Sequence, residues 1–174
     1  QVKNATISLE LLLELRKMGF DISNESIYNG FSTVDWPCRF ELVSKNPDFI
    51  LDGAHNIDGI EKFISNMNFY YKNNKKIAIF GVLADKDYNE MLKKIIPCFD
   101  VFLTVRPDSE RAMKALELKE RIEVLTEKKV YSFENYQDAI DKAFEISNKE
   151  DVISAFGSLY FVGEVRKLLG VSDY

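Results

Sequence analysis

Three polar residues that could bind a ligand follow one short apolar run. Asp52, His55 and Asn56 come directly after Phe49–Leu51, and His55 is the only histidine in the 174 residues. The run has the length and character of a buried strand, and the segment after it has a helical period. Its apolar face comprises Ile60, Phe63, Ile64, Met67 and Tyr71. We therefore expect the polar residues in a strand-to-helix loop at the carboxyl end of a parallel strand, where open α/β sheets bind ligands.

Similar polar groups follow other predicted strands. The strand that ends at Val82 is followed by Asp85, Lys86 and Asp87. The strand that ends at Val105 is followed by Arg106, Asp108 and Ser109, and the one that ends at Phe156 by Gly157-Ser158. A helix that starts at Ser158 would present free backbone N–H groups and a hydroxyl to a carboxylate or a phosphate. The pattern predicts a polar rim that tolerates anions along one edge of the sheet, without specifying the ligand.

Each of these residues also has an ordinary structural explanation. An aspartate at a strand end often anchors a loop, and a single loop histidine is more often structural or exposed than catalytic. Asp85-Lys86-Asp87 fits a solvated turn, and Asp108 fits a helix cap. These groups together indicate a site because all of them converge on one predicted edge.

Motifs for ATP hydrolysis are absent from the sequence. No glycine precedes a lysine, so there is no G-x-x-x-x-G-K-[ST] phosphate loop, and there is no G-x-G-x-x-G turn. His55 has no neighbouring nucleophile arranged as a triad, and no histidine cluster could hold a metal, so we predict no metal site here. Such a chain could bind one side of a substrate or nucleotide but should not hydrolyse ATP by itself.

The elements that would position this edge alternate between strand and helix. Strands are predicted at 39–43, 49–52, 76–82, 101–105, 129–132 and 152–156, with later helices near 88–95, 112–122, 136–147 and 158–169. The Lys45–Asp48 turn is too short for a helical crossover, so the first two strands should form an antiparallel hairpin. The pattern predicts an α/β fold, a three-layer Rossmann-like sandwich whose mostly parallel sheet has one antiparallel edge strand.

Two helices, at 5–18 and 23–31, should precede this sheet. The first would carry Ile7, Leu11, Leu15 and Met18 on one face. Pro37 favours an extended conformation at Trp36. We therefore place a boundary there, with residues 1–35 forming one part and residues 36–174 the α/β domain.

Composition limits the classes of protein. The net charge is −5 and there is no basic block, which argues against a nucleic-acid partner. No apolar stretch approaches the roughly 20 residues of a membrane span, and no signal peptide is evident. Cys38 and Cys98 form neither a metal motif nor a disulfide framework and fit reduced thiols in the cytoplasm. We expect a monomer, and because the chain does not begin with methionine, we expect a fragment of a longer protein.

Four segments together resemble folylpolyglutamate synthases, which often double as dihydrofolate synthases in bacteria and belong to the Mur ligase superfamily. They are Trp36–Glu41 (WPCRFE), Ile50–Asn56 (ILDGAHN), Phe80–Asp87 (FGVLADKD) and Gly157–Arg166 (GSLYFVGEVR). The resemblance covers nearly the whole chain, in order and with the expected gaps. The D-G-A-H-N and G-S-L-Y elements are similar to the folate enzymes, whereas peptidoglycan Mur ligases usually have D-Y-A-H-N.

The resemblance implies an enzyme that uses ATP to join L-glutamate to a folate carboxylate through an acyl phosphate. It implies that residues 36–174 are the C-terminal domain and that residues 1–35 are the last helices of the preceding ATPase domain. The phosphate loop and the Mg²⁺ ligands would lie in that N-terminal domain. The expected partners are then the ATPase domain, ATP, L-glutamate and folate, and neither nucleic acid nor a membrane.

The family pattern also implies roles for individual residues. Arg39 would face the nucleotide phosphates and Asp52 the ribose or base, with Asn56 in the same motif. His55 and Ser158 would hold the incoming glutamate and so take part in catalysis. These roles suit the groups, because a guanidinium forks onto phosphate oxygens and a helix N-terminus attracts carboxylates.

Three positions depart from the family pattern. Cys38 stands where most members have glycine, which could alter the loop that aims Arg39. Ile57 replaces a common proline at a helix start, and Phe156 replaces a threonine hydroxyl beside Ser158.

Two other functions are compatible with parts of the pattern. One is a Mur-type ligase domain for a peptidoglycan precursor. The other is a non-catalytic α/β binding module of the receiver or flavodoxin-like kind, although the early strands lack the acidic pair that a receiver domain needs.

Overall fold

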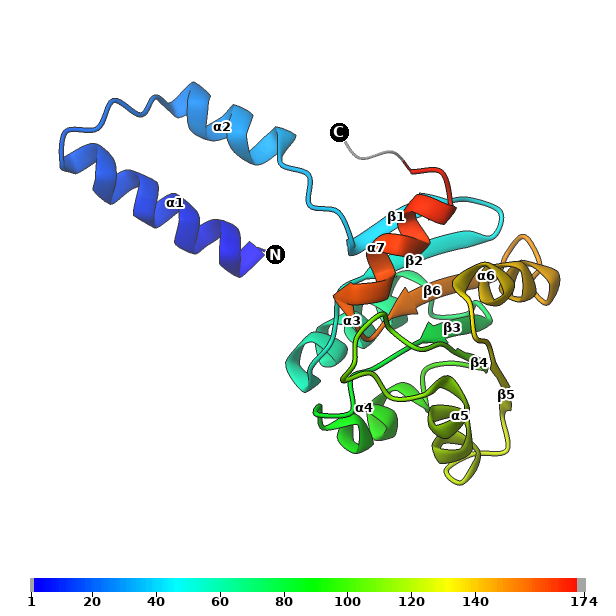
Figure 1. The fold of residues 1–174 in the computed structure, drawn as a ribbon. Coiled ribbons are helices and arrows are strands. Elements are labelled where there is room, and N and C mark those ends of the chain that lie inside the picture. Colours follow the sequence, from blue (N-terminus) through cyan, green and yellow to red (C-terminus); the bar gives the residue numbers. More distant parts are fainter. Residues whose placement is uncertain (1, 172–174) are drawn as a thin grey trace. The chain divides into compact units, whose positions relative to one another are not determined.

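The structure, a computed structural model, describes residues 2–171 and contains two compact units, Gln1–Trp36 and Pro37–Tyr174 (Figure 1). The first unit contains α1 (Val2–Lys17) and α2 (Asn24–Thr33). Ser23 caps α2, because its hydroxyl accepts a hydrogen bond from the Ser26 backbone N–H. Both helices were predicted, with ends that differ by a few residues. No helix among the described residues has the length and apolar character needed to cross a membrane.

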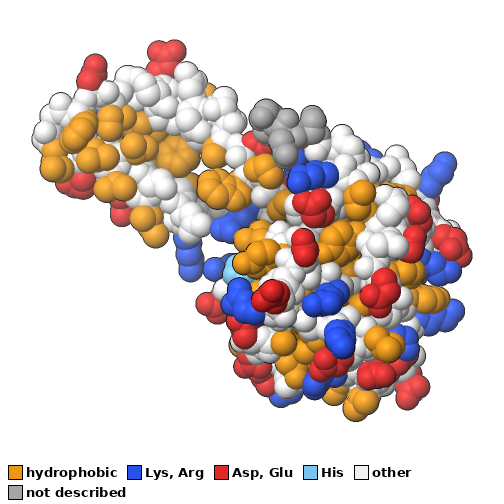
Figure 2. Space-filling model, viewed as in Figure 1, with side chains coloured by type: hydrophobic (Ala, Val, Ile, Leu, Met, Phe, Trp, Pro, Cys, Tyr) orange, Lys and Arg blue, Asp and Glu red, His pale blue; other side chains and the backbone are white. Residues whose placement is uncertain are grey.

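The two helices of the first unit bury none of their residues. Figure 2 shows apolar side chains gathered over this unit. The exposed apolar residues include Ile7, Leu11, Leu13, Met18, Tyr28 and Phe31. The apolar face predicted for α1 therefore exists, but these two helices alone do not form a core around it.

The second unit is built on a six-stranded sheet with the order β1-β2-β6-β3-β4-β5. The strands are β1 (Arg39–Ser44), β2 (Asp48–Asp52), β3 (Lys76–Phe80), β4 (Val101–Thr104), β5 (Lys129–Ser132) and β6 (Val152–Phe156). Strand β1 pairs antiparallel with β2, and all other neighbours are parallel. The predicted sheet and its antiparallel edge strand are confirmed.

Helices cover both faces of this sheet, as three layers require (Figure 1). On one face lie α3 (Ile57–Tyr70), α4 (Tyr88–Ile95) and α5 (Ala115–Glu123), and on the other lie α6 (Tyr136–Glu145) and α7 (Leu159–Leu168). Alternate strand residues supply the two cores. In β2, for example, Ile50 joins the core under α3, and Phe49 and Leu51 join the core under α7. The three-layer α/β sandwich is confirmed.

One helix starts later than its sequence pattern predicts. We expected the fifth helix to begin at Ala112, but Ala112 forms an isolated antiparallel bridge with Leu83, and the Met113 N–H donates to the Val82 carbonyl over 3.0 Å. These residues are extended because they pair with the segment that follows β3. Helix α5 therefore begins at Ala115.

The connections around β6 create a switch point in the sheet. Strands β2 and β3, which flank β6, lead into α3 and α4 on one face, whereas β6 leads into α7 on the other face. Chains that leave neighbouring strands in opposite directions separate beyond the carboxyl ends of those strands. This is where ligands bind in open α/β sheets, and the polar segments after β2 and β6 both lie here.

Candidate functional site

The five predicted site residues lie at one edge of the sheet. The Gly157 N–H donates to the Ala54 carbonyl over 2.9 Å, which joins the loop after β6 to the loop after β2. Across the hairpin, Arg39 is paired in register with Asp52, so β1 begins where β2 ends. The structure therefore brings together the segments that carry Arg39, Asp52, His55, Asn56 and Ser158.

The Asp52 carboxylate anchors two backbone segments. Its Oδ2 accepts from the Phe40 N–H over 2.9 Å, and its Oδ1 accepts from the Ala54 N–H over 2.8 Å. Burial raises the pKa of Asp52 despite these two hydrogen bonds and the nearby Arg39 charge, which act to lower it. Asp52 thus anchors the loop, which is the structural role expected of an aspartate at a strand end. Since each carboxylate oxygen has a second lone pair, the group can still accept a hydrogen bond from a ligand.

One ring nitrogen of His55 is hydrogen-bonded to the backbone. Its Nδ1 lies 2.8 Å from the Gly53 carbonyl oxygen. A carbonyl can only accept, so Nδ1 carries the proton, and Nε2 is the acceptor of the neutral ring or a donor of the charged ring. The side chain is half-buried. This orientation leaves Nε2 as the ring atom that can serve a ligand.

Asn56 and Ile57 begin α3. The Asn56 Oδ1 accepts from the Gly59 N–H over 2.8 Å and caps the helix, so this oxygen has a structural role. Ile57 is the first helical residue. That is the position at which proline is favoured, so the structure explains why proline would suit this position.

Ser158 caps α7, directly after β6. Its hydroxyl accepts from the Tyr160 N–H over 3.3 Å, and the residue is only 2% exposed. The predicted helix start at this edge is therefore present, with the hydroxyl turned to the helix backbone. Phe156, the last strand residue, packs into an aromatic cluster with Phe63 and Phe80, at ring centroid distances of 4.5 and 5.2 Å. The departure from threonine thus places a core contact where a hydroxyl would be.

Arg39 is exposed and lies between two residues in left-handed backbone conformations. Cys38 has φ +58° and Phe40 has φ +51°. Glycine adopts this region without steric cost, which explains a family preference for glycine at position 38. The Cys38 side chain is buried in the core under α7, so the departure from glycine adds apolar contact at a strained position.

Sequence reasoning missed one buried ion pair near this edge. Arg166 of α7 is only 4% exposed, and its Nε lies 3.1 Å from Glu41 Oε1 of β1. The signal was available, because Arg166 stands four residues after Val162 on the apolar face of α7 and so falls on a core position.

Polar groups at the other strand ends are tied to one another rather than to the switch point. Arg111 pairs with Asp85 at 2.8 Å, Asp87 caps α4, and the Arg106 carbonyl accepts from the Tyr136 hydroxyl over 2.9 Å. The contacts of Asp85 and Arg106 fit the turn alternative. The helix cap expected at Asp108 is wrong, because α5 begins at Ala115 and its N-cap residue is Lys114.

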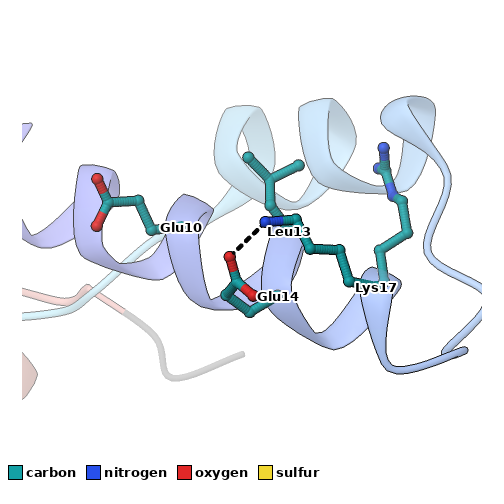
Figure 3. A pocket seen from close by; sticks show the side chains of 5 residues that line it. Glu10, Leu13, Glu14 and Lys17 are labelled. Carbon is teal, nitrogen blue, oxygen red and sulfur yellow. Dashed lines mark hydrogen bonds and ion pairs between the residues drawn. The ribbon is translucent and has the colours of Figure 1, made fainter.

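Two surface hollows among the described residues contain no predicted site residue. One is lined by Glu10, Leu13, Glu14, Arg16 and Lys17, all on α1, and includes the Lys17–Glu14 ion pair at 2.7 Å (Figure 3). The other lies at the opposite edge of the sheet, around Lys76 and Asp100, where β3 and β4 begin. Residues 2–171 contain no group of three or more His, Cys, Asp or Glu side chains that could hold a metal ion.

Comparison with known proteins gives a consistent result. Residues 38–159 match the family described as Mur ligase, glutamate ligase domain. The dihydrofolate synthase/folylpolyglutamate synthase of Bacillus subtilis is 32% identical over 170 residues, which is 97% of this chain and 39% of that protein.

Solved structures extend the comparison to three dimensions. Escherichia coli FolC in complex with DHPP and ADP has a TM-score of 0.81 at 28% identity, covering 91% of this chain and 37% of that one. A bifunctional folylpolyglutamate synthase/dihydrofolate synthase with Mn, AMPPNP and L-glutamate bound has a TM-score of 0.78 at 26% identity, covering 90% of this chain and 37% of that one. The chain therefore spans less than two fifths of the length of these relatives.

Proposed function

This chain belongs to the Mur ligase family through its glutamate ligase domain, and from this premise we propose that it serves as the C-terminal domain of a folylpolyglutamate synthase. The enzyme would phosphorylate a folate carboxylate with ATP to give an acyl phosphate. The amine of L-glutamate would then attack the acyl carbon, and phosphate would leave. Dihydropteroate is a second acceptor of the same chemistry, which would give dihydrofolate.

The observation that carries the proposal is the convergence of five motif residues on the switch point of the sheet. The exposed Arg39 would contact nucleotide phosphates, and Asp52 would accept from ribose hydroxyls or the base. Nε2 of His55 and the start of α7 at Ser158 would receive the carboxylates of glutamate. Holding the amine against the acyl phosphate is where much of the rate gain would arise.

The proposal assigns the remaining parts to other segments. The described residues offer no metal-binding group, so the proposed Mg²⁺ ligands and phosphate loop would lie in a preceding ATPase domain. The exposed apolar face of α1 and α2 supports such a neighbour, because residues 1–35 would be the last helices of that domain. We further propose a cytoplasmic monomer, which agrees with the two free cysteines.

Sequence similarity favours a folate enzyme over a peptidoglycan Mur ligase, because the Bacillus subtilis relative is a dihydrofolate synthase/folylpolyglutamate synthase. The family membership itself favours a ligase over a non-catalytic binding module.

The proposal is tested by turnover. We expect a full-length protein that contains this chain to form ADP over many turnovers only when ATP, a reduced folate and L-glutamate are all present. We expect the 174-residue chain alone to form none. Peptidoglycan precursors offered in place of folate are the matched control. Sustained ADP formation without glutamate, activity with the precursors alone, or sustained turnover by the isolated chain would each contradict the proposal.

The raised pKa of Asp52 gives a second prediction, on pH. Ribose hydroxyls donate to the ionised carboxylate of Asp52. The affinity for ADP should therefore be highest above the raised pKa and should fall as the pH drops through that pKa. The stability of the fold should change with pH in the opposite direction. The native state binds the proton more readily than the unfolded state, so the contribution of Asp52 to stability grows as the pH falls through the same window.

Calorimetric titration of ADP against the full-length enzyme at several pH values would check this prediction. The Asp52→Asn variant is the control, because its affinity should be lower and should lack this pH step. A carboxyl resonance of Asp52 that titrates at or below the pH of an exposed aspartate would contradict the premise.

A further inference from the structure

A buried ion pair joins the last helix to the first strand of the sheet. Nε of Arg166 lies 3.1 and 3.2 Å from the two carboxylate oxygens of Glu41, with side chains only 5% and 16% exposed. Nη1 of Arg166 also donates to the Val171 carbonyl over 3.3 Å. Desolvating two charges costs enough that such a pair contributes little net stability compared with apolar residues of the same volume. Stability alone therefore does not account for the pair.

The carboxylate of this pair also holds the backbone before Arg39. The Oε2 of Glu41 accepts from the Cys38 N–H over 2.7 Å. On the other side, the Cys38 carbonyl accepts from the Gly53 N–H over 2.7 Å, and Asp52 accepts from the Phe40 N–H. The segment Cys38–Phe40 is thus fixed at three points around the exposed Arg39.

This segment needs external support. Cys38 and Phe40 both have positive φ, and the pairing of β1 with β2 shifts register between Arg39 and Glu41. Non-glycine residues hold such conformations only where surrounding contacts impose them. If the contact from Glu41 were lost, the segment would relax, and the direction of the Arg39 side chain would change with it.

We propose that Arg166 and Glu41 are positioning residues that hold Cys38 and Phe40 in their left-handed conformations and so aim the Arg39 guanidinium at the nucleotide phosphates. The inference rests on the proposed function, in which Arg39 contacts those phosphates. A preorganised guanidinium pays less conformational entropy when it binds. The charge pair therefore acts on nucleotide affinity through Arg39 and not by direct contact.

The test is a double-mutant cycle in the full-length enzyme, with ADP as the probe. Two single variants are made, Arg166→Met and the milder Glu41→Gln. Each is made once in the native protein and once in the Arg39→Ala variant. We expect each to weaken ADP binding about tenfold in the native background, and by less than about twofold in Arg39→Ala. Arg166→Lys, which keeps the charge, should recover part of the loss.

Two further readouts separate positioning from general destabilisation. Val165→Ala, one residue earlier on α7, removes buried core contacts and leaves both charged side chains in place; it should lower the melting temperature and leave ADP affinity unchanged. If Arg166→Met and Glu41→Gln weaken ADP binding equally in both backgrounds, the positioning role is overturned while the proposed function stands. If Arg39→Ala itself leaves ADP affinity unchanged, the phosphate role of Arg39 fails and the inference fails with it.

Discussion

Replacing Gly157 with alanine is expected to destabilise the α/β unit by about 4 kcal/mol. Gly157 has φ +113°, a conformation that costs other residues free energy, and an added Cβ would meet the Gly81 carbonyl oxygen and approach the Phe80 ring to 2.6 Å. Neither neighbour can give way easily, because Phe80 is fully buried and Gly81 is itself packed against the Val105 carbonyl. The free-energy costs of backbone strain and of overpacking therefore add together at this position.

The same change should disturb the candidate site. The Gly157 N–H donates to the Ala54 carbonyl, so a shift of the loop after β6 would pull on the loop that carries His55. Gly163→Ala is a matched control on α7, where nothing lies within 4 Å of the added Cβ. It should stabilise the protein by about 0.5–1 kcal/mol, as alanine does in a helix.

Urea denaturation of both variants, followed by circular dichroism, would measure the difference. A cost of less than about 1 kcal/mol for Gly157→Ala would contradict this expectation, because the geometry around Gly157 would then be loose.

The architecture could be predicted because its signals are local. Each strand is an apolar run of the right length, each helix has one apolar face, and the short Lys45–Asp48 connection permits only an antiparallel pair. The position of β6 between β2 and β3 could not be read in this way, because periodicity says which residues are buried and not which strands pair. The late start of α5 has the same origin, since the pairing of Ala112 with Leu83 joins two distant segments.

The candidate site could be predicted as a set of residues but not as a set of hydrogen bonds. Polar groups at the carboxyl ends of parallel strands must share one edge, and Asp52 and Ser158 do. The sequence does not show which polar side-chain atoms are hydrogen-bonded to backbone groups. Both oxygens of Asp52 and the hydroxyl of Ser158 have backbone partners, and the Glu41–Arg166 pair forms across segments that no local pattern connects.

Replacing His55 with alanine in the full-length enzyme should mainly impair the use of glutamate. The substitution removes Nε2, the ring nitrogen that the Gly53 contact leaves for a ligand, and with it one charge-assisted contact worth about 1.5–3 kcal/mol. That loss corresponds to a rise in the Michaelis constant for glutamate of roughly 10-fold to 150-fold. The Michaelis constant for ATP should change little, because Asp52 and Arg39 are the proposed nucleotide contacts.

Two conservative variants separate the two ring nitrogens. In His55→Asn the side-chain amide can replace Nδ1 and keep the bond to Gly53, but nothing reaches the position of Nε2. In His55→Gln the longer side chain places its amide nearer Nε2 and gives up the backbone contact. If Nε2 binds glutamate, the asparagine variant should be as impaired as alanine, and the glutamine variant should recover part of the activity.

The reverse order would assign His55 a different role. An asparagine variant with normal glutamate kinetics, beside an impaired glutamine variant, would mean that the bond to the Gly53 carbonyl is what matters and that His55 shapes the loop. A rise in the Michaelis constant for ATP with none for glutamate would place the side chain on the nucleotide side. In either case glutamate recognition would depend on the start of α7, where the backbone N–H groups at Ser158 remain the only proposed receptor at this edge.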